Sequence, residues 1–335
     1  KNTVLCIAAL LALFSAILVP PDAQYLGYFD TRTLTCLFCT LAMVCALRHI
    51  RFFTCIACGI ISITKNLRRS VLALVYITFI GSMLIANDMA LLTFLPLGYI
   101  VLSETGEERH MAYVFILQNI AANLGGMLTP FGNPQNLYLY SYFAIPTPDF
   151  LRVMFPPFAL SVAMITICCL FFPADSLTVR TEKIVLPRVR TVVYLALFAF
   201  SIAIVFRAIP YWLGLLVIPA ALLFLDRRAL ADVDYPLLGT FVCFFLFSGN
   251  LARIPAVQSF FGELLSTSPL VVSALSCQCI SNVPSAILLS HFTDNWQELL
   301  LGVNIGGAGT IIASLASLIT FREFTKHNPG KAGVY

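Results

Sequence analysis

Long stretches of apolar residues, almost free of charge, run through this chain and decide what it can fold into. They cover residues 4–19, 33–47, 151–172, 191–206, 212–225 and 236–249. A helix needs about 20 mostly apolar residues to cross the hydrocarbon core of a bilayer, and these stretches reach or approach that length. They are continuous rather than alternating, which favours helices over the strands of a membrane barrel. We therefore expect an all-α polytopic membrane protein.

The composition agrees with a place in a lipid bilayer. Of the 335 residues, 59% are hydrophobic and only 11% are charged, whereas soluble domains carry about 25% charged residues. No long polar segment is present to build a second domain. The formal net charge of +4 comes from cations that lie between the apolar stretches, so it gives no reason to expect a nucleic-acid partner.

The positions of Lys and Arg predict an orientation, because these residues concentrate on the cytoplasmic side of a membrane. Four groups lie within residues 48–69, 180–190, 227–228 and 322–331. Placing all four inside makes the C-terminal tail, 323–335, cytoplasmic in a multi-pass protein of the cell inner (plasma) membrane. Residues 52–64 are too few to span and are expected to lie along the inner surface.

The same orientation leaves two segments, 70–102 and 269–290, that must enter and leave the membrane on one side. We expect re-entrant hairpins that dip in from opposite faces. Each segment has a polar kink in its middle, ANDMA at 86–90 and ISNVPSA at 280–286.

Two parts of the chain repeat one pattern. NLGGMLTPFGNPQN at 123–136 aligns with NIGGAGTIIASLAS at 304–317, which pairs Asn123 with Asn304 and Thr129 with Thr310. The predicted orientations of the two copies are opposite, and inverted repeats of this kind are typical of secondary transporters. The predicted division is repeat 1 at 1–145, connecting transmembrane helices at 146–207 and repeat 2 at 208–322. Repeat 1 holds the hairpin at 70–102 and a broken helix at 111–142, and repeat 2 holds the hairpin at 269–290 and a broken helix at 296–320.

The broken helices carry polar residues and glycines where hydrocarbon would normally exclude them. Irregular backbone at membrane depth persists only where protein or a water-filled cavity satisfies it. Unwound carbonyls with Asn and Thr oxygens can coordinate sodium, and half-helix N-termini attract an anion. Glycine lets backbone approach a ligand closely. The expected hinge or close-approach positions are Gly125, Gly126, Gly306 and Gly307.

Asp88 is the only ionisable residue in either kink, and its counterpart in the second hairpin is Val283. An ionisable group inside a membrane segment is a functional hypothesis by default. A carboxylate there can bind sodium or carry a coupled proton. The structural alternative is that Asp88 caps the hairpin helix beside Asn87.

These motifs resemble the ion transporter superfamily, which includes arsenite permeases, sodium/proton antiporters, and citrate and dicarboxylate/sodium symporters. SNVPSA at 281–286 and TPFGNPQN at 129–136 are similar to the hairpin and loop motifs of the dicarboxylate branch, whereas ANDMALL at 86–92 resembles the Ala-Asn-Asp hairpin of arsenite permeases. The resemblance implies a fixed scaffold, a mobile part that holds both hairpins and both broken helices, elevator-like alternating access and a homodimer. The chain departs from the dicarboxylate branch at Asp88, where that branch has Thr.

The resemblance, carried onto this sequence, assigns two overlapping sets of site residues, to which Gly132 and Gly309 are added because glycine lets backbone approach a ligand closely. The substrate-binding set is Asn87, Asn133, Asn136, Asn282, Thr310 and Ser314. The set for the coupling ion, sodium or a proton, is Asp88, Asn87, Thr129, Gly132, Ser281, Asn282 and Gly309. We expect no catalytic residues and no cofactor, apart from sodium as a coupling ion.

The leading hypothesis is a secondary active transporter for a small anion, a carboxylate or an oxyanion, driven by sodium or protons. One alternative is an arsenite-type efflux permease or a cation/proton antiporter, which the ANDMA kink favours. Another is a passive anion channel. An enzyme is not expected, because the sequence offers no set of catalytic side chains at membrane depth.

Overall fold

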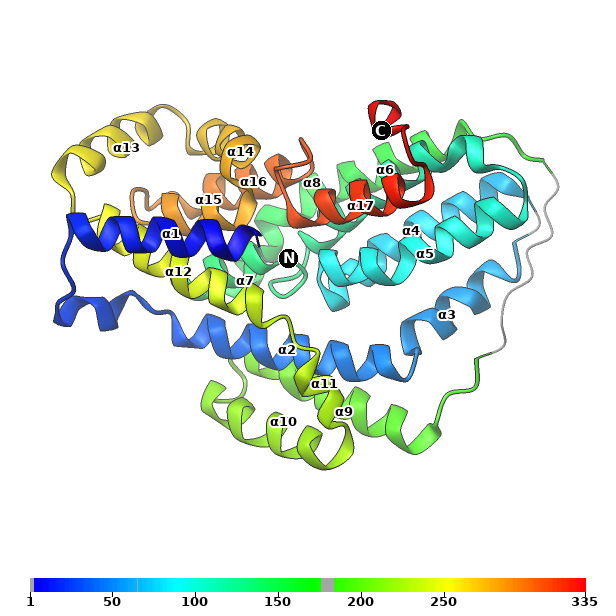
Figure 1. Ribbon diagram of the computed structural model, residues 1–335, viewed down its shortest axis with the longest axis horizontal. Helices are drawn as coiled ribbons and strands as arrows, with labels where there is room; N and C mark the ends of the chain where they lie inside the picture. Colours follow the sequence, from blue (N-terminus) through cyan, green and yellow to red (C-terminus); the bar gives the residue numbers. More distant parts are fainter. Residues whose placement is uncertain (1–2, 65, 176–183) are drawn as a thin grey trace.

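The computed structural model describes residues 3–64, 66–175 and 184–335, and its regular elements are helices throughout this part of the chain (Figure 1). Lys65, Arg180 and Lys183, which belong to the cationic groups used above for orientation, lie outside the described residues. The six apolar stretches form, in order, α1 (Thr3–Leu18), α2 (Thr31–His49), α8 (Thr147–Leu170), α9 (Arg188–Val205), α10 (Tyr211–Leu225) and α12 (Tyr235–Leu251).

Five of the helical segments are long and apolar enough to cross a membrane. They are α2, α4 (Leu67–Ile85), α8, α9 and the segment Arg227–Leu251, which joins α11 (Arg227–Ala231) to α12. A sixth span results if α13 (Pro255–Thr267) and α14 (Pro269–Ile280), which meet at a bend of 118°, are taken together. The expectation of an all-α polytopic membrane protein is confirmed.

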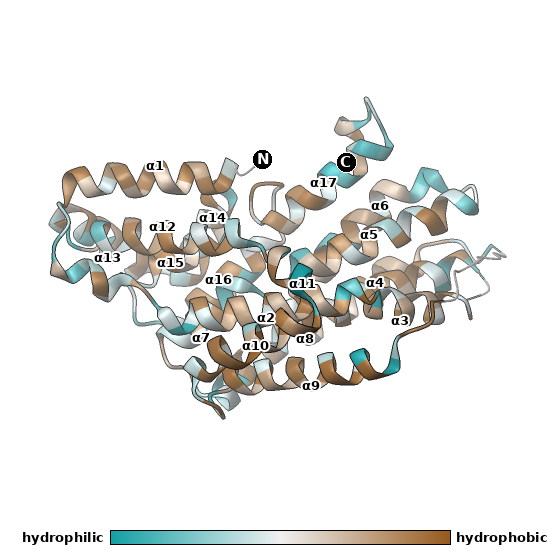
Figure 2. Cartoon of the chain, turned by 60° about the horizontal axis from the view of Figure 1, so that its bottom comes forward, coloured by the Kyte–Doolittle hydropathy of each residue, from teal (hydrophilic) through white to brown (hydrophobic). Residues whose placement is uncertain are grey.

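The outer helices turn apolar side chains outward rather than into a core. Only 22% of the membrane-length window of α8 and 28% of that of α9 is buried, and large side chains such as Phe155 and Phe171 are more than half exposed. Figure 2 shows α9 and α10 mostly brown along their length. An apolar surface of this size is stable in contact with lipid chains but not in contact with water.

Two series of elements follow the same order along the chain. The first is α2, α3 (Phe52–Ile61), the helix pair α4 and α5 (Asn87–Glu104), and the helix pair α6 (Met111–Gly126) and α7 (Pro134–Tyr142). The second is α12, α13, the pair α14 and α15 (Asn282–Leu289), and the pair α16 (Trp296–Gly307) and α17 (Leu315–His327). In Figure 1, α4 and α5 lie in the right half of the view and α14 and α15 in the left half.

Each series begins with an aspartate that caps its first helix. Asp30 Oδ1 accepts a hydrogen bond from Thr33 N at 2.9 Å, and Asp234 Oδ1 accepts one from Leu237 N at 3.0 Å. Such a cap satisfies one of the free N–H groups of the first helical turn.

The helix pairs α4–α5 (hairpin 1) and α14–α15 (hairpin 2) turn on a single residue. Ala86 has φ 66° and ψ 151°, and Ser281 has φ 73° and ψ 159°. Backbone of this kind is essentially restricted to glycine and costs about 1–3 kcal/mol for other residues. The same costly conformation occurs at the same place in both hairpins, directly before Asn87 and Asn282.

Both broken helices are interrupted, at 127–133 (break 1) and at 308–314 (break 2). Break 1 ends at Asn133, and Pro134 then starts α7 at a position where a missing N–H costs nothing. Break 2 ends at Ser314, whose side chain caps α17 by accepting from Ser317 N. The second half of this broken helix continues to His327, past residue 322.

Candidate functional site

The tip of hairpin 1 lies against break 1. Asn87 N donates to Gly132 O at 3.2 Å, and Thr129 Oγ1 donates to Met83 O at 2.7 Å. The Asn87 side chain folds back at the tip, because its Oδ1 accepts from Asp88 N at 3.0 Å. Gly132 lets break 1 fold closely on itself, since a Cβ there would lie 2.3 Å from Gly126 O.

The tip of hairpin 2 lies against break 2 in the same way. Asn282 N donates to Ala313 O at 2.9 Å, and Asn282 Oδ1 accepts from Val283 N at 2.9 Å. Gln278 strengthens the contact, because its Nε2 donates to Gly306 O and its Oε1 accepts from Thr310 N. Each hairpin therefore forms one unit with the break that follows it in the chain.

A buried network of amide side chains joins the two units, and it consists of Asn87, Asn119, Asn123, Asn133, Gln135, Asn136 and Asn304. Asn304 on α16 is its centre. Its Oδ1 accepts from Asn133 Nδ2 at 3.1 Å, and its Nδ2 donates to Asn136 Oδ1 at 2.6 Å. A second link runs from Asn119 Nδ2 to Ser317 Oγ at 3.1 Å. Buried amides paired in this way fix the relative position of the two breaks.

Three acceptor oxygens around break 1 are buried and have no hydrogen-bond donor among the described residues. They are Asp88 Oδ1, Asn133 Oδ1 and Gln135 Oε1. A buried polar atom without a partner costs about 1–3 kcal/mol, so it needs an explanation such as a bound ion or water. Carboxylate, amide and main-chain oxygens are the ligands that hard cations prefer. These atoms are chemically suited to a sodium ion.

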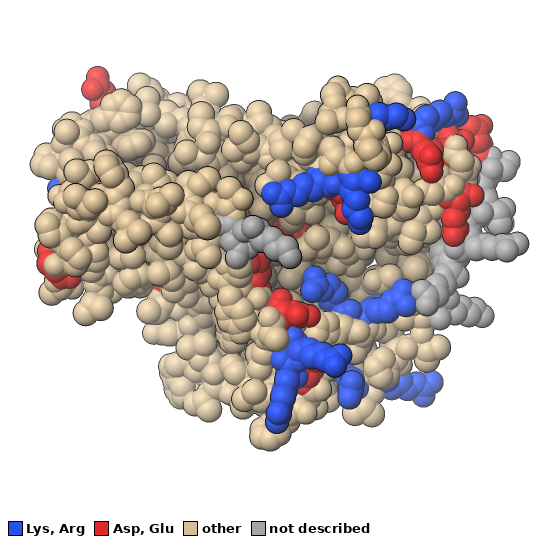
Figure 3. Space-filling view, viewed as in Figure 1, with Lys and Arg blue, Asp and Glu red and all other residues tan. Residues whose placement is uncertain are grey.

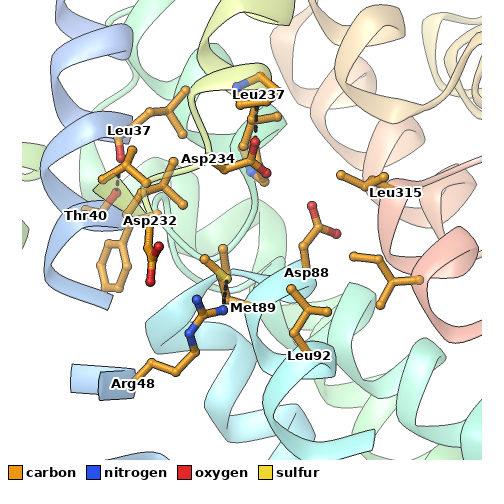
Figure 4. A pocket seen from close by; sticks show the side chains of 17 residues that line it. Leu37, Thr40, Arg48, Asp88, Met89, Leu92, Asp232, Asp234, Leu237 and Leu315 are labelled. Atoms are coloured by element: carbon orange, nitrogen blue, oxygen red, sulfur yellow. Dashed lines mark hydrogen bonds between the residues drawn. The ribbon is translucent and has the colours of Figure 1, made fainter. Parts of the chain in front are cut away.

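A cavity of about 320 Å³ opens beside hairpin 1 (Figure 4). Its walls come from α2, from the hairpin 1 tip, from the start of α12 and from α17. The charged residues that line it are Arg48, Asp88, Asp232 and Asp234. In Figure 3 the face that carries α11 and α17 is hollowed, and Lys and Arg side chains lie around the hollow together with Asp and Glu side chains. The charges around the hollow are therefore of both signs.

The structure distributes the predicted residues over two units rather than around one cavity. Asp88 lines the cavity, while Asn133 and Ser314 directly precede the lining residues Pro134 and Leu315. Asn282, Ser281, Gly309 and Thr310 belong to hairpin 2 and break 2, which do not line it. Asn136 is fully buried in the amide network, and the Thr310 side chain is exposed. Within the described residues, no hydrogen bond joins Asn87 directly to Asn282.

The predicted hinge glycines lie at close helix contacts. A Cβ on Gly125 would lie 2.2 Å from Phe79 O on α4, and one on Gly306 would lie 2.7 Å from Ala274 O on α14. A Cβ on Gly126 or Gly307 would meet the side chain of Asn133 or Asn282 within 3 Å. Gly125 and Gly306 therefore let the broken helices touch the hairpins backbone to backbone, whereas Gly126 and Gly307 make room for an Asn side chain.

Several functional candidates were not predicted from the sequence. Asn119 and Asn123 lie one turn apart on α6, and two amides on one face of an apolar helix are a recognisable signal. Gln135 has no such signal. Arg48 was assigned to a cytoplasmic cationic group, yet it lines the cavity opposite Asp88.

Comparisons with known proteins agree with a transporter. A family model described as citrate transporter matches residues 2–319. The uncharacterized transporter MJ0456 of Methanocaldococcus jannaschii is 31% identical over 297 residues, which cover 88% of this chain and 81% of that protein. The inner membrane protein YbiR of Escherichia coli strain K12 is 31% identical over 264 residues, or 76% of this chain and 69% of that protein.

Proposed function

Because the chain belongs to the citrate transporter family, we propose that it moves a small anion, a carboxylate or an oxyanion, by secondary active transport coupled to sodium or protons. Family membership makes it a multi-pass membrane transporter and not an enzyme. The substrate class, the coupling ion and the transport mechanism go beyond family membership and are what we propose.

One observation carries the proposal. Both hairpin tips turn on a residue with positive φ, and the main-chain N–H of the Asn that follows donates to break 1 in hairpin 1 and to break 2 in hairpin 2. Half-helix ends and unwound carbonyls placed in this way are the elements from which transporters build ion and substrate sites. The repeated order of elements and the opposite orientations deduced from Lys and Arg together support two inverted repeats, each with a re-entrant hairpin.

Asp88 would bind the coupling ion at the hairpin 1 tip. Its Oδ1 has no donor among the described residues, and the unpaired oxygens of Asn133 and Gln135 in the adjoining broken helix also favour a cation. A bound sodium ion or proton removes the negative charge of Asp88 before an anion enters the same cavity. The anion therefore binds well only when the cation is present, and this order couples the two fluxes.

We place the cavity between the two bodies that an elevator mechanism requires. In the proposal α2 and α12 belong to the fixed scaffold, and the two hairpins and two broken helices move together as one body. The amide network supports this division, because it ties both breaks to each other. We further propose a place in the inner membrane with the C-terminus in the cytoplasm, which the cationic groups and the name of YbiR support. A homodimer is proposed only because the resemblance to the ion transporter superfamily implies one.

A second candidate, a cation/proton antiporter or arsenite-type efflux permease, is favoured by one observation. Three carboxylates and one guanidinium line the cavity, so its lining residues carry a negative sum when all are ionised. Such a lining would attract a cation, or a neutral solute exchanged for protons.

Transport assays in proteoliposomes separate these candidates. Citrate, succinate, sulfate and arsenite would each be offered under a sodium gradient and under a proton gradient. The proposal expects saturable, sodium- or proton-driven uptake of at least one anion. Proton-driven movement of sodium or arsenite, with no anion carried, would establish the second candidate instead. A flux that rises linearly with concentration and never runs against a gradient would indicate a channel.

A further inference from the structure

The cavity beside hairpin 1 contains four charged side chains, and two of its three carboxylates already have partners. Asp232 Oδ2 lies 2.8 Å from His49 Nε2, and the other ring nitrogen of His49 lies 2.9 Å from Asp226 Oδ2. Asp234 caps α12 through Leu237 N. Asp232 and Asp234 are therefore occupied in holding the scaffold together.

Arg48 has no such partner. The only hydrogen-bond contact of its side chain in the described part of the chain runs from Nη1 to Met89 Sδ, at 3.7 Å. A thioether is a weak acceptor. The guanidinium has five N–H donors, so most of its capacity is unused at the edge of a half-buried cavity. A charged group that is this poorly satisfied favours a ligand of opposite charge.

The backbone that carries Arg48 is rigid. Arg48 lies in the last turn of α2, directly after a run of buried residues from 41 to 47. One turn earlier on α2, Cys45 Sγ donates to the main-chain oxygen of Asp232 at 3.4 Å. In Figure 4 Arg48 approaches the cavity from α2 while Asp88 approaches it from α5. Arg48 and Asp88, the two charged residues of the cavity whose side chains make neither an ion pair nor a helix cap among the described residues, thus belong to the scaffold and to the moving body of the proposed elevator, respectively.

We propose that Arg48 is a specificity-determining residue that binds an anionic group of the substrate from the scaffold, while Asp88 and its cation hold the substrate from the hairpin side. This inference rests on the proposed function. The planar guanidinium fork matches a carboxylate or another oxyanion with two parallel hydrogen bonds. A cavity of about 320 Å³ is near the lower limit for ligand sites, so it suits a small molecule with one or two such groups.

The contact also gives the scaffold a role in selectivity. When the hairpin body moves, Arg48 stays with α2, so the substrate loses this contact in the other state. An anionic group is thus bound more tightly on one side of the membrane than on the other. The substrate class that fits is a small carboxylate or oxyanion whose charge is only partly neutralised by the cation at Asp88.

The test compares Arg48→Gln, Arg48→Lys and the wild type in proteoliposomes, with labelled succinate, citrate and sulfate as probes. Arg152→Gln is the control, because Arg152 is a strongly exposed arginine on α8, outside the cavity. We expect Arg48→Gln to raise the KM for the transported anion about tenfold or more, equivalent to about 1.4 kcal/mol. Its dependence on the coupling ion should stay unchanged. Arg48→Lys, which keeps the charge but loses the fork, should show a smaller increase.

A second readout separates binding from a structural role. Loss of the guanidinium should raise the KM for the transported anion and leave the maximal uptake rate near that of the wild type, whereas damage to folding would lower the maximal rate and leave the KM unchanged. If Arg48→Gln does not fold, the Arg48→Lys measurement decides alone, and a KM equal to that of the wild type overturns the inference. Wild-type anion transport with unchanged KM in both variants overturns the role of Arg48 and leaves the proposed function standing. A wild type that carries none of the anions contradicts both.

Discussion

At the scale of single residues, the sequence marks polar groups that apolar helices would not otherwise contain. Asn87, Asn133 and Asn282 were singled out because amides at helix breaks are costly without a purpose. The structure pairs the side-chain nitrogens of Asn87 and Asn133 but leaves Asn133 Oδ1, like Asp88 Oδ1 and Gln135 Oε1, without a donor among the described residues. A surplus of acceptors is the pattern expected where a cation completes the site.

Replacing Asp88 by Asn tests whether its charge couples the two fluxes. The amide has the same size, and the cap contact at the tip runs through Asp88 N, so folding should be preserved. We expect the coupling ion to activate transport about tenfold less, because a contact to a charged group contributes about 1.5–3 kcal/mol. The measurement is the initial uptake rate as a function of sodium concentration and, separately, of the proton gradient.

The matched control is Glu104→Gln, at the exposed end of the same helix. It removes one carboxylate from α5 without touching the cavity and should behave as the wild type does. Unchanged ion dependence in Asp88→Asn would restrict Asp88 to a structural role at the hairpin tip.

At the scale of elements, close backbone contacts hold each hairpin to its broken helix. A methyl group on Gly125 would lie 2.2 Å from the main-chain oxygen of Phe79, which cannot rotate away as a side chain could. Gly125→Ala should therefore destabilise the protein by about 1–3 kcal/mol, as overpacking commonly does. The melting temperature in detergent is the measurement.

Gly59→Ala serves as the comparison, because nothing lies within 4 Å of the position where its Cβ would be. Alanine favours a helix over glycine by about 1 kcal/mol, so this variant should melt at the same temperature or higher. Equal melting temperatures for the two variants would show that α4 and α6 can separate without cost.

The helices were largely predictable, and their tertiary partners were not. Apolar runs located α1, α2, α8, α9, α10 and α12, and polar kinks located both hairpin tips within a few residues. Local chemistry is enough for this, since each signal lies within the element that it defines. The contact of Asn304 with Asn133 and Asn136 joins residues about 170 positions apart, and nothing local encodes it. The place of Arg48 in the cavity wall was missed for a related reason: the sequence shows a cation at a helix end, but not which other elements lie opposite it.

At the scale of the whole molecule, a second contact joins the two series of elements, away from the cavity. The loop after α15 meets the end of α7, where Ser290 Oγ lies 2.7 Å from Tyr138 Oη and the His291 ring packs edge-on against Tyr142. Burial lowers the pKa of His291 from its ordinary value of 6.5 to about 4. The folded protein thus holds this imidazole neutral over a range in which the unfolded chain would protonate it.

This difference predicts a loss of stability in mild acid. Between about pH 6.5 and about pH 4 the unfolded state binds a proton at His291 that the folded state does not, so stability falls as the pH falls through this window and levels off below it. The melting temperature should therefore decrease more in the wild type than in His291→Gln. Taking the difference between the two proteins cancels the other histidines. Parallel curves for the two proteins would contradict the prediction.

The single-residue turns at Ala86 and Ser281 have a consequence for how a gate could work. Neither hairpin has a flexible loop at its tip, and the residue after each turn, Asn87 or Asn282, donates its N–H to the adjoining break. A tip cannot move away from its break without losing that hydrogen bond and deforming a backbone that is already strained. We therefore expect each hairpin tip to stay attached to its own helix break, so that access to the ligand changes only when hairpin and broken helix move together.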